Sequence, residues 1–301
     1  MIRNKRQTIA KNIFVYGMLA YPILQFVVFW FSKNITTITM AFKTVENGQE
    51  VFAGLTNFSE LLSRFKTEKL FQISLKNSIL NFILAFVISV PLYIIFSYYI
   101  FKKCFGSRTL QFMMMIPKIV SSIIMVLIFK RVVEDILPML FYSVNPEFPN
   151  LLKDGRYAFW TQLVFNIWLS FSTNILIYPN AMNAISPEVI ESARLDGVNM
   201  WQELWYIIIP HIFPTFSTFF ITNCTTLFVS PASLVTFYYY DKCPPEAYNM
   251  GYYMMVTVMR NTGSRAMQCF ASAGSLALTI ITVPIAMTAK WALEKYGPKE
   301  E

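Results

Sequence analysis

Charged residues divide this chain into long apolar stretches. A helix of about 20 apolar residues crosses a hydrocarbon core of roughly 30 Å. Five stretches of that length lack charged side chains: they lie between Lys11 and Lys33, Lys76 and Lys102, Arg156 and Glu188, Glu203 and Asp241, and Arg265 and Lys290. A sixth, residues 109–129, is interrupted only by Lys118. The pattern predicts an all-α polytopic bundle of six transmembrane helices, one domain over residues 1–301, with spans near 12–34, 75–101, 109–131, 158–182, 206–232 and 266–290.

The segments between these spans are short. We expect the outer segments near 43–74, 132–157 and 233–265 to hold at most small helices. The inner segment at 183–205 is the one substantial element on the other side. Six spans place both termini on one side, and basic residues gather there at the N-terminus, around Lys102 and around Lys295. The positive-inside rule therefore predicts cytoplasmic termini, although the outer loops also carry basic residues, mixed with acidic ones.

Composition agrees with a membrane location. Hydrophobic residues make up 55% of the chain and charged residues 14%, whereas soluble proteins are about a quarter charged. The net charge of +8 fits basic residues that face anionic lipid headgroups, and it does not indicate a nucleic-acid partner. The first apolar run is too long for a signal peptide and lacks a small-residue cleavage site. The four scattered cysteines and the lone histidine indicate neither a metal site nor a disulfide framework. We expect His211 to be an interfacial or packing residue and not a catalyst.

Polar amides lie inside the predicted spans, among them Asn166, Asn174 and Asn223. Hydrogen bonds between helices would account for most such residues in a membrane protein. The alternative is that these three asparagines line a polar path through the bundle. Lys118 has the same two interpretations. It either reaches back to the cytoplasmic interface or faces the path and contacts substrate oxygens.

The inner segment contains signals for two helices and a bend. Ser186 is a candidate N-cap followed by proline and glutamate, which is typical of a helix start. Gly197 can adopt the left-handed conformation that ends a helix. Asn199 is followed three residues later by Gln202, the spacing of a capping box. We predict two short helices joined at Gly197, with the second one leading toward Pro210 and the fifth span.

This segment resembles the EAA loop of binding-protein-dependent ABC importer permeases. The family pattern is E-A-A, three residues, G, nine residues, I, one residue, L, P. Here Glu191, Ala193, Gly197, Ile207 and Pro210 occupy the matching positions. The chain departs from the pattern at two positions, where Ser192 and Ile209 replace residues of similar size.

The resemblance implies a mechanical role and a set of partners. The first helix of the loop would dock on an ATP-hydrolysing subunit, so that Glu191, Ser192, Ala193, Asp196, Gly197, Ile207 and Pro210 form an ATPase-coupling site. The chain lacks a G-x-x-x-x-G-K-[ST] phosphate loop, so ATP and Mg²⁺ would be bound by the partner and no cofactor by this chain. The expected assembly has two ATPases, a second and different permease and an extracellular solute-binding protein, in the plasma membrane of a prokaryote.

The expected cargo is a sugar. Asp196-Gly197 and the segments Gly54–Phe58, Leu75–Ser78 and Ala271–Ala273 resemble the carbohydrate-importer branch of the family. The alternatives are a permease for another solute and, from a different class, an ATP-independent channel, which would not need the bent loop. A membrane-embedded enzyme is a more distant alternative, because no acid pair, serine–histidine pair or metal set is visible within the spans.

Overall fold

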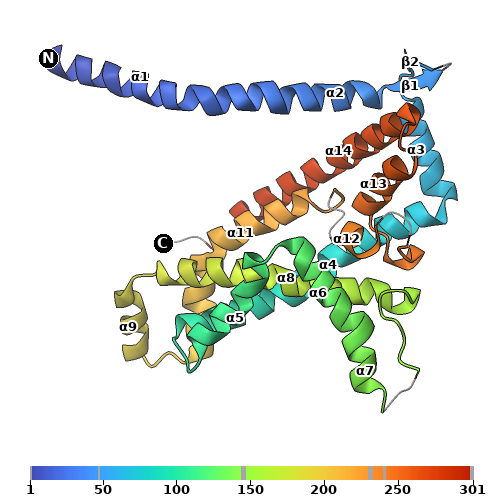
Figure 1. Ribbon diagram of the computed structural model, residues 1–301. Helices are drawn as coiled ribbons and strands as arrows, with labels where there is room; N and C mark the ends of the chain where they lie inside the picture. Colours follow the sequence, from blue (N-terminus) through green and yellow to red (C-terminus); the bar gives the residue numbers. More distant parts are fainter. Residues whose placement is uncertain (1, 47, 144–146, 230–232, 240–241, 299–301) are drawn as a thin grey trace. The chain divides into compact units, whose positions relative to one another are not determined.

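The computed structural model describes residues 2–46, 48–143, 147–229, 233–239 and 242–298, with side chains described from residue 11 on (Figure 1). The chain divides into two compact units, residues 1–62 with 261–277 and residues 63–260 with 278–301. Helix α3 (Thr56–Thr67) crosses from the first unit to the second, and so does helix α14 (Arg265–Tyr296).

The first unit begins with a long continuous helix. It is made of α1 (Ile2–Gln25), the π-helix η1 (Phe26–Phe31) and α2 (Ser32–Ala41). Residues 11–41 of this helix are apolar enough to span a membrane, and the side chains of residues 11–33 are exposed. Apolar side chains on all faces of a helix are typical of a segment surrounded by lipid. The predicted span 12–34 therefore lies inside a longer helix.

A β-hairpin follows, where the sequence had predicted only small helices. Strands β1 (Lys43–Glu46) and β2 (Gln49–Phe52) pair antiparallel, with Glu46 opposite Gln49. Gly48 has a φ of +81°. Asn47 lies outside the described residues, but an Asn-Gly pair between two strands is the sequence signal of a two-residue hairpin loop. The purely α-helical prediction is wrong at this point.

Two polar side chains hold the hairpin within the first unit. Asn57 Nδ2 donates to the backbone oxygens of Ala41 and Lys43, at 2.9 and 2.8 Å. The Glu50 carboxylate pairs with Arg265 at 2.7 Å and with Lys43 at 3.1 Å. These two cations, Arg265 first, hold the pKa of Glu50 below its ordinary value.

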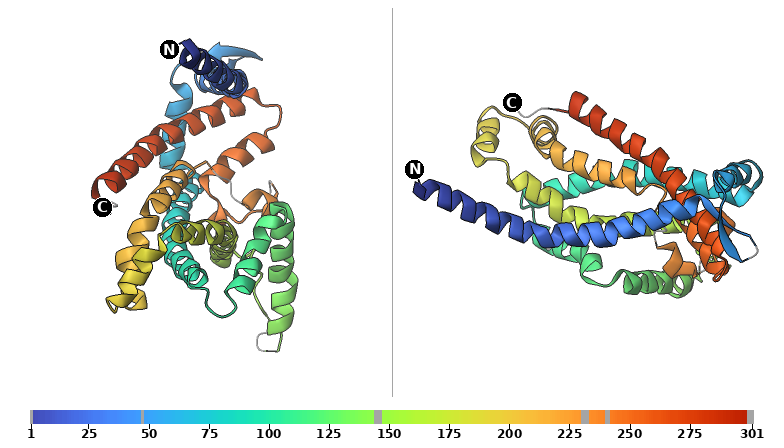
Figure 2. Two further views of the ribbon diagram at one scale, coloured as in Figure 1. Left: turned by 90° about the vertical axis from the view of Figure 1, so that its left-hand side faces the viewer. Right: turned by 90° about the horizontal axis from the view of Figure 1, so that it is seen from above.

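The regular secondary structure of the second unit consists of helices among its described residues. In chain order, α3 is followed by α4 (Lys69–Phe101), α5 (Ser107–Ile119), α6 (Ser122–Arg131), η2 (Val132–Ile136), α7 (Leu137–Phe141), α8 (Gly155–Asn183), α9 (Pro187–Leu195), α10 (Met200–Gln202), η3 (Glu203–Ile208), α11 (Ile209–Thr225), α12 (Leu234–Tyr238), η4 (Pro245–Ala247) and α13 (Met250–Arg260). Helix α8 is central, because it packs along α4 and also contacts α5 and α11 (Figure 2).

Within the described residues, four helices are long and apolar enough to cross a membrane. They are Lys11–Ala41, Lys69–Phe101, Met200–Thr225 and Arg265–Tyr296. A fifth is added if α5 and the segment Ser122–Phe141 count as one broken span. Helix α8 has 29 residues but is more polar than these. The protein is therefore a mostly helical, polytopic membrane protein, and the total of six spans stays a prediction.

The predicted span 109–131 is not one straight helix. The helix axis bends by 107° between Ile119 and Ser122. Val120 and Ser121 have extended backbones, with ψ of 145° and 136°. Ser121 then occupies the N-cap position of α6. Pro117 cannot donate a backbone hydrogen bond, which weakens the last turn of α5 just before the bend.

The fifth predicted span, 206–232, is shifted toward the N-terminus. The helix already begins at Met200 and ends at Thr225, and residues 226–229 form turns. Residues 230–232, including Pro231, lie outside the described residues. The sequence predicts a short helix that leads to Pro210, with the fifth span beginning there. The helix instead continues through the wider π-helical turn η3, which accommodates the missing N–H of Pro210 without a break.

A hydrophobic cluster joins five of these elements in the second unit. It contains Tyr93 and Tyr98 of α4, residues of α8, Ile190 of α9, and Leu204, Ile208 and Ile212 from η3 and α11. Because α9 and the start of the following helix share this cluster, the inner segment is packed against the helical bundle.

Candidate functional site

The bent inner segment starts with α9. Ser186 is the N-cap residue and Pro187 the first helical residue, as predicted. The Ser186 side chain does not cap a backbone N–H. The Glu188 carboxylate instead accepts hydrogen bonds from its own backbone N–H and from the Ser186 hydroxyl, and these bonds lower the pKa of Glu188.

Gly197 ends α9 in a Schellman motif. Its φ is +75°. The Gly197 N–H donates to the oxygen of Arg194, and the Val198 N–H to that of Ala193, both at 3.1 Å. This is the paired hydrogen bonding of the motif, with glycine at the left-handed position. No atom lies within 4 Å of the place where a Cβ would sit. Backbone conformation, and not lack of space, therefore favours glycine here.

Asn199 and Gln202 form the predicted capping box. The Gln202 N–H donates to Asn199 Oδ1, and the Asn199 N–H to Gln202 Oε1, each at 2.9 Å. The helix that starts here runs through η3 into α11. A rigid, capped connection thus leads from α9 into the fifth predicted span.

The coupling residues predicted from the sequence fall on two faces of this segment. Ala193 is buried, at 7% exposed, and so is Ile190 one turn earlier. Glu191 and Ser192 are exposed, and Leu195 is 89% exposed. A groove of the surface is lined by Glu188, Val189, Ser192, Ala193, Asp196, Gly197, Val198, Gln202, Tyr206 and Ile207.

The groove contains five of the seven predicted coupling residues: Ser192, Ala193, Asp196, Gly197 and Ile207. Glu191 lies on the exposed face of α9 outside this lining, and Pro210 is partly buried in α11. Sequence reasoning missed Leu195 and Tyr206. Both side chains are exposed, Leu195 at 89% and Tyr206 at 79%, and Tyr206 also lines the groove.

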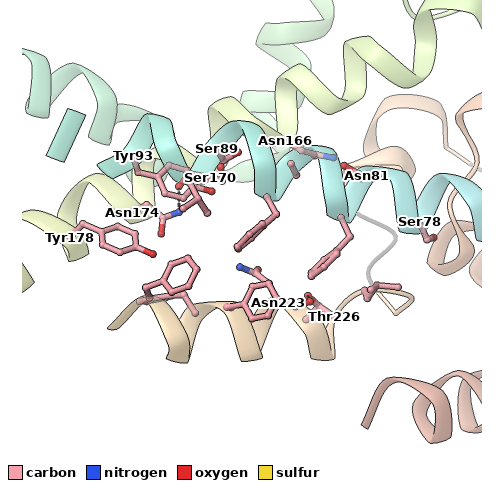
Figure 3. A pocket seen from close by; sticks show the side chains of 18 of the residues that line it. Ser78, Asn81, Ser89, Tyr93, Asn166, Ser170, Asn174, Tyr178, Asn223 and Thr226 are labelled. Atoms are coloured by element: carbon pink, nitrogen blue, oxygen red, sulfur yellow. Dashed lines mark hydrogen bonds between the residues drawn. The ribbon is translucent and has the colours of Figure 1, made fainter. Parts of the chain in front are cut away.

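A polar cavity of about 230 Å³ lies in the second unit between α4, α8 and α11 (Figure 3). Three of the four predicted path residues line it: Asn166 and Asn174 from α8, and Asn223 from α11. The other lining residues are Ser78, Asn81, Phe82, Ala85, Phe86, Ser89, Val90, Tyr93, Ser170, Tyr178, Phe216, Phe219, Phe220, Thr226, Leu227 and Asn249.

The hydrogen bonds of the three asparagines differ. Asn174 Nδ2 donates to the backbone oxygen of Ser170 at 2.9 Å, and Asn166 Oδ1 accepts from Ser233 Oγ at 3.2 Å. For these two residues, hydrogen bonding within the bundle is therefore part of the explanation. The Asn223 side chain has no hydrogen-bond partner among the described residues. The Ser89 hydroxyl is buried and likewise unpartnered, so a ligand or water in the cavity would satisfy it.

The cavity lining is uncharged and rich in aromatic rings. Phe86 and Phe220 stack edge to face at 4.7 Å between centroids, and Tyr93 and Tyr178 lie nearly parallel at 6.0 Å. Amide and hydroxyl groups alternate with these rings (Figure 3). Such a surface suits a polyhydroxylated, uncharged ligand, whose hydroxyls bond to amides and whose apolar faces contact rings.

Lys118 does not line this cavity. It is exposed at the C-terminal end of α5, next to the 107° bend, where the helix dipole favours a cation. It lines a neighbouring pocket together with Ser121, Ser122, Asn166 and Ser170. Asn166 and Ser170 belong to both linings. The structure thus brings Lys118 to the wall shared with the cavity, but not into the cavity.

Comparisons with known proteins agree with these features. At 24% identity over 223 residues, the chain is similar to the arabinooligosaccharides transport system permease protein AraP of Halalkalibacterium halodurans, covering 72% of this chain and 68% of that one. At 26% identity over 225 residues, it is similar to the sn-glycerol-3-phosphate transport system permease protein UgpA of Agrobacterium fabrum, covering 72% and 73%.

The fold also matches a solved structure. A chain in the crystal structure of a bacterial alginate ABC transporter, in complex with an alginate pentasaccharide-bound periplasmic protein, superposes with a TM-score of 0.78 at 18% identity. The match covers 98% of this chain and 99% of that one. Residues 101–299, more than half of the chain, match the family described as binding-protein-dependent transport system inner membrane component. The chain belongs to this family of ABC importer permeases.

Proposed function

We propose that this protein is the transmembrane permease subunit of an ABC importer that takes up an uncharged oligosaccharide. The observation that carries the cargo assignment is the cavity between α4, α8 and α11, which combines amides, hydroxyls and aromatic rings without a charged lining residue among the described ones. An arabinooligosaccharide permease among its relatives supports the same substrate class.

The lining argues against an anionic cargo. Two of the similar proteins are named for the transport of anionic solutes, sn-glycerol-3-phosphate in one case and alginate in the other. Binding such a solute away from water calls for a cation that balances its charge. Lys118 is the nearest candidate in the shared wall, and it opens into the adjoining pocket. This placement favours a neutral saccharide.

In the proposed assembly, this chain supplies half of the translocation path and a second permease supplies the other half. Two ATP-hydrolysing subunits bind ATP and Mg²⁺ on the cytoplasmic side, and an extracellular binding protein delivers the sugar. The proposed topology has six spans, with α8 and the bent α5–α6 pair each crossing the membrane, and both termini in the cytoplasm. A polar span such as α8 is tolerated where other helices surround it.

The groove beside α9 is the proposed contact with the ATPase. Its exposed residues include Ser192, Asp196 and Gly197. Glu191 has no ion-pair partner among the described residues, so it is free to meet a basic residue of the partner. Ala193, Ile207 and Pro210 would support the docking helix from inside, because they are buried or partly buried.

The test is uptake by the complete transporter in proteoliposomes with its binding protein. We expect ATP-dependent uptake of a neutral oligosaccharide that neither an excess of a uronic-acid oligosaccharide nor glycerol phosphate inhibits. Uptake without ATP would favour a channel. Uptake of the acidic sugar alone would contradict the cargo assignment, while leaving the permease assignment intact.

A further inference from the structure

A buried ion pair links the end of α4 to the start of the helix that continues into α11. Both Glu203 oxygens lie 2.9 Å from Lys102 Nζ. The Glu203 side chain is 4% exposed and that of Lys102 is 12% exposed. Glu203 is the first residue of η3, and Lys102 is the C-cap residue of α4. We call this pair the Lys102–Glu203 clamp.

A second contact lies one turn earlier on α4. Tyr98 Oη donates to the backbone oxygen of Met200 at 3.2 Å. Lys102 Nζ lies 5.7 Å from the centroid of the Tyr98 ring. Tyr98 also belongs to the hydrophobic cluster that contains Ile190 of α9 and Leu204 of η3. The end of α4 therefore bonds to the helix that follows the Gly197 bend, and it shares the hydrophobic cluster with α9, which precedes the bend.

The clamp occupies a mechanically sensitive place. A π-helical turn interrupts the regular i→i−4 hydrogen bonds of an α-helix, and it is one of the places where helices kink. Glu203 begins this turn, directly between the capping box at Asn199 and the rest of α11. Without an anchor on Glu203, a force applied at α9 could be lost by bending at η3 before it reached α11.

The net stability from such a pair is expected to be small. The free energy needed to remove two charges from water nearly cancels the free energy of their attraction. Proteins in which apolar residues of similar volume replace such a pair are therefore often equally stable. A charged, two-oxygen contact does, however, set a specific geometry between its partners. The geometry of the clamp is therefore its more valuable contribution.

We infer that Lys102 and Glu203 are positioning residues that make α9, the start of α11 and the end of α4 move as one body. Two walls of the polar cavity belong to these helices, with Ser89 and Tyr93 on α4 and Phe216 and Asn223 on α11. Motion received at α9 would then reach both walls together. This inference rests on the proposed function, because it takes α9 as the contact with the ATPase.

The first experiment measures the ATP hydrolysed per sugar molecule imported by the complete transporter in proteoliposomes. We expect Lys102→Met and Glu203→Gln each to raise this ratio about tenfold, while the amount of ATPase that co-purifies stays unchanged. Lys103→Met is the matched control, since Lys103 is the exposed neighbouring lysine, and we expect it to keep the wild-type ratio. Wild-type ratios in both clamp variants would overturn the inference.

Loss of folding could imitate loss of coupling, so a double variant separates the two. Lys102→Met with Glu203→Leu removes both charges and leaves no unpaired buried group. We expect this variant to assemble in normal amount and still show the raised ratio. If the double variant has the wild-type ratio of ATP hydrolysed to sugar imported, apolar packing at these two positions is enough for coupling. The positioning role of the ion pair would then be wrong.

A cross-link tests the shared motion directly. Cysteines are placed at positions 102 and 203 in a variant lacking the four native cysteines, and a short bifunctional thiol reagent joins them. Because the two cysteines remove the ion pair, we expect the untreated variant to show the raised ratio of ATP hydrolysed to sugar imported, and the cross-link to lower this ratio toward the wild-type value. The inference would be overturned if the cross-link abolished uptake. The same reagent on each single-cysteine variant, which must leave uptake intact, is the control. Failure of the proposed function would look different from failure of this inference. In that case the wild-type protein itself would bind no ATPase or import no sugar.

Discussion

The backbone N–H groups of Asn199 and Gln202 each donate a 2.9 Å hydrogen bond to the other residue's side chain. This exchange starts the helix that continues from the inner segment into α11. It satisfies two backbone donors that a helix start otherwise leaves to water. The connection between α9 and the cavity wall thus begins at a defined residue, and it can be tested there.

Asn199→Ala removes the acceptor for the Gln202 N–H. An N-cap of this kind contributes about 1 kcal/mol, so we expect hydrogen-exchange protection of Gln202 and Glu203, whose N–H groups donate to Asn199, to fall about fivefold. Amide exchange followed by mass spectrometry measures this directly. Asn199→Asp keeps an acceptor oxygen and should keep the protection. Equal loss in both variants would contradict a capping role.

Gly197→Val forces a β-branched residue into the left-handed region, where φ is +75°. The bend would open at a cost of about 1–2 kcal/mol, and we expect less ATPase to co-purify with the permease. Gly197→Asn is the matched control, since asparagine tolerates this conformation and no atom lies within 4 Å of its Cβ position. If the valine variant binds the ATPase in normal amount, the bend at Gly197 is not part of the docking surface.

Asn223→Ala deletes an amide that lines the cavity and has no partner among the described residues. If the amide bonds to the sugar, one hydrogen bond of about 1 kcal/mol is lost and KM for uptake rises about fivefold. Thr222→Ala changes the neighbouring residue, which lines a different pocket, and should leave KM unchanged. A similar KM in both variants would exclude Asn223 from the path.

Lys118→Met removes the cation beside the 107° bend. Because Lys118 lines the adjoining pocket and not the cavity, we expect uptake of a neutral oligosaccharide to stay within about twofold of wild type. The amount of inserted protein serves as the control. If uptake falls strongly while the amount of inserted protein is normal, Lys118 lies on the translocation path. This is the second of the two interpretations that its sequence position allows.

Acid should loosen the β-hairpin of the first unit. Arg265 and Lys43 lower the pKa of Glu50 below 4.5 in the folded protein, so the carboxylate contributes stability above its unfolded pKa. That contribution is lost as the pH falls through the folded pKa. We expect faster amide exchange in residues 43–52 below pH 4.5, after correction for the intrinsic rate. Glu50→Gln should show this looser hairpin already at neutral pH, and a pH-independent hairpin would contradict the role of Glu50.

The inner segment could be predicted well because its signals are local. The capping box, the left-handed glycine and the start at Pro187 each depend on residues at most five positions apart. The hairpin also had a local signal in Asn47-Gly48, and it was missed because the pattern around it was taken as a loop between spans. The charge-free runs located the long helices, although the cap at Asn199 set the start of the fifth one earlier than hydrophobicity alone predicted.

By itself, the sequence determined the apolar helices, the bend at Gly197 and the family resemblance, because these depend on composition and on neighbours along the chain. Tertiary structure decided which asparagines share a cavity, that Lys118 lies in the adjoining pocket, and that the helix axis turns between Ile119 and Ser122. It also decided the partnership of Lys102 with Glu203, which are 101 positions apart. Such contacts depend on how α4, α8 and α11 pack, and no short-range pattern encodes the distance between two helices.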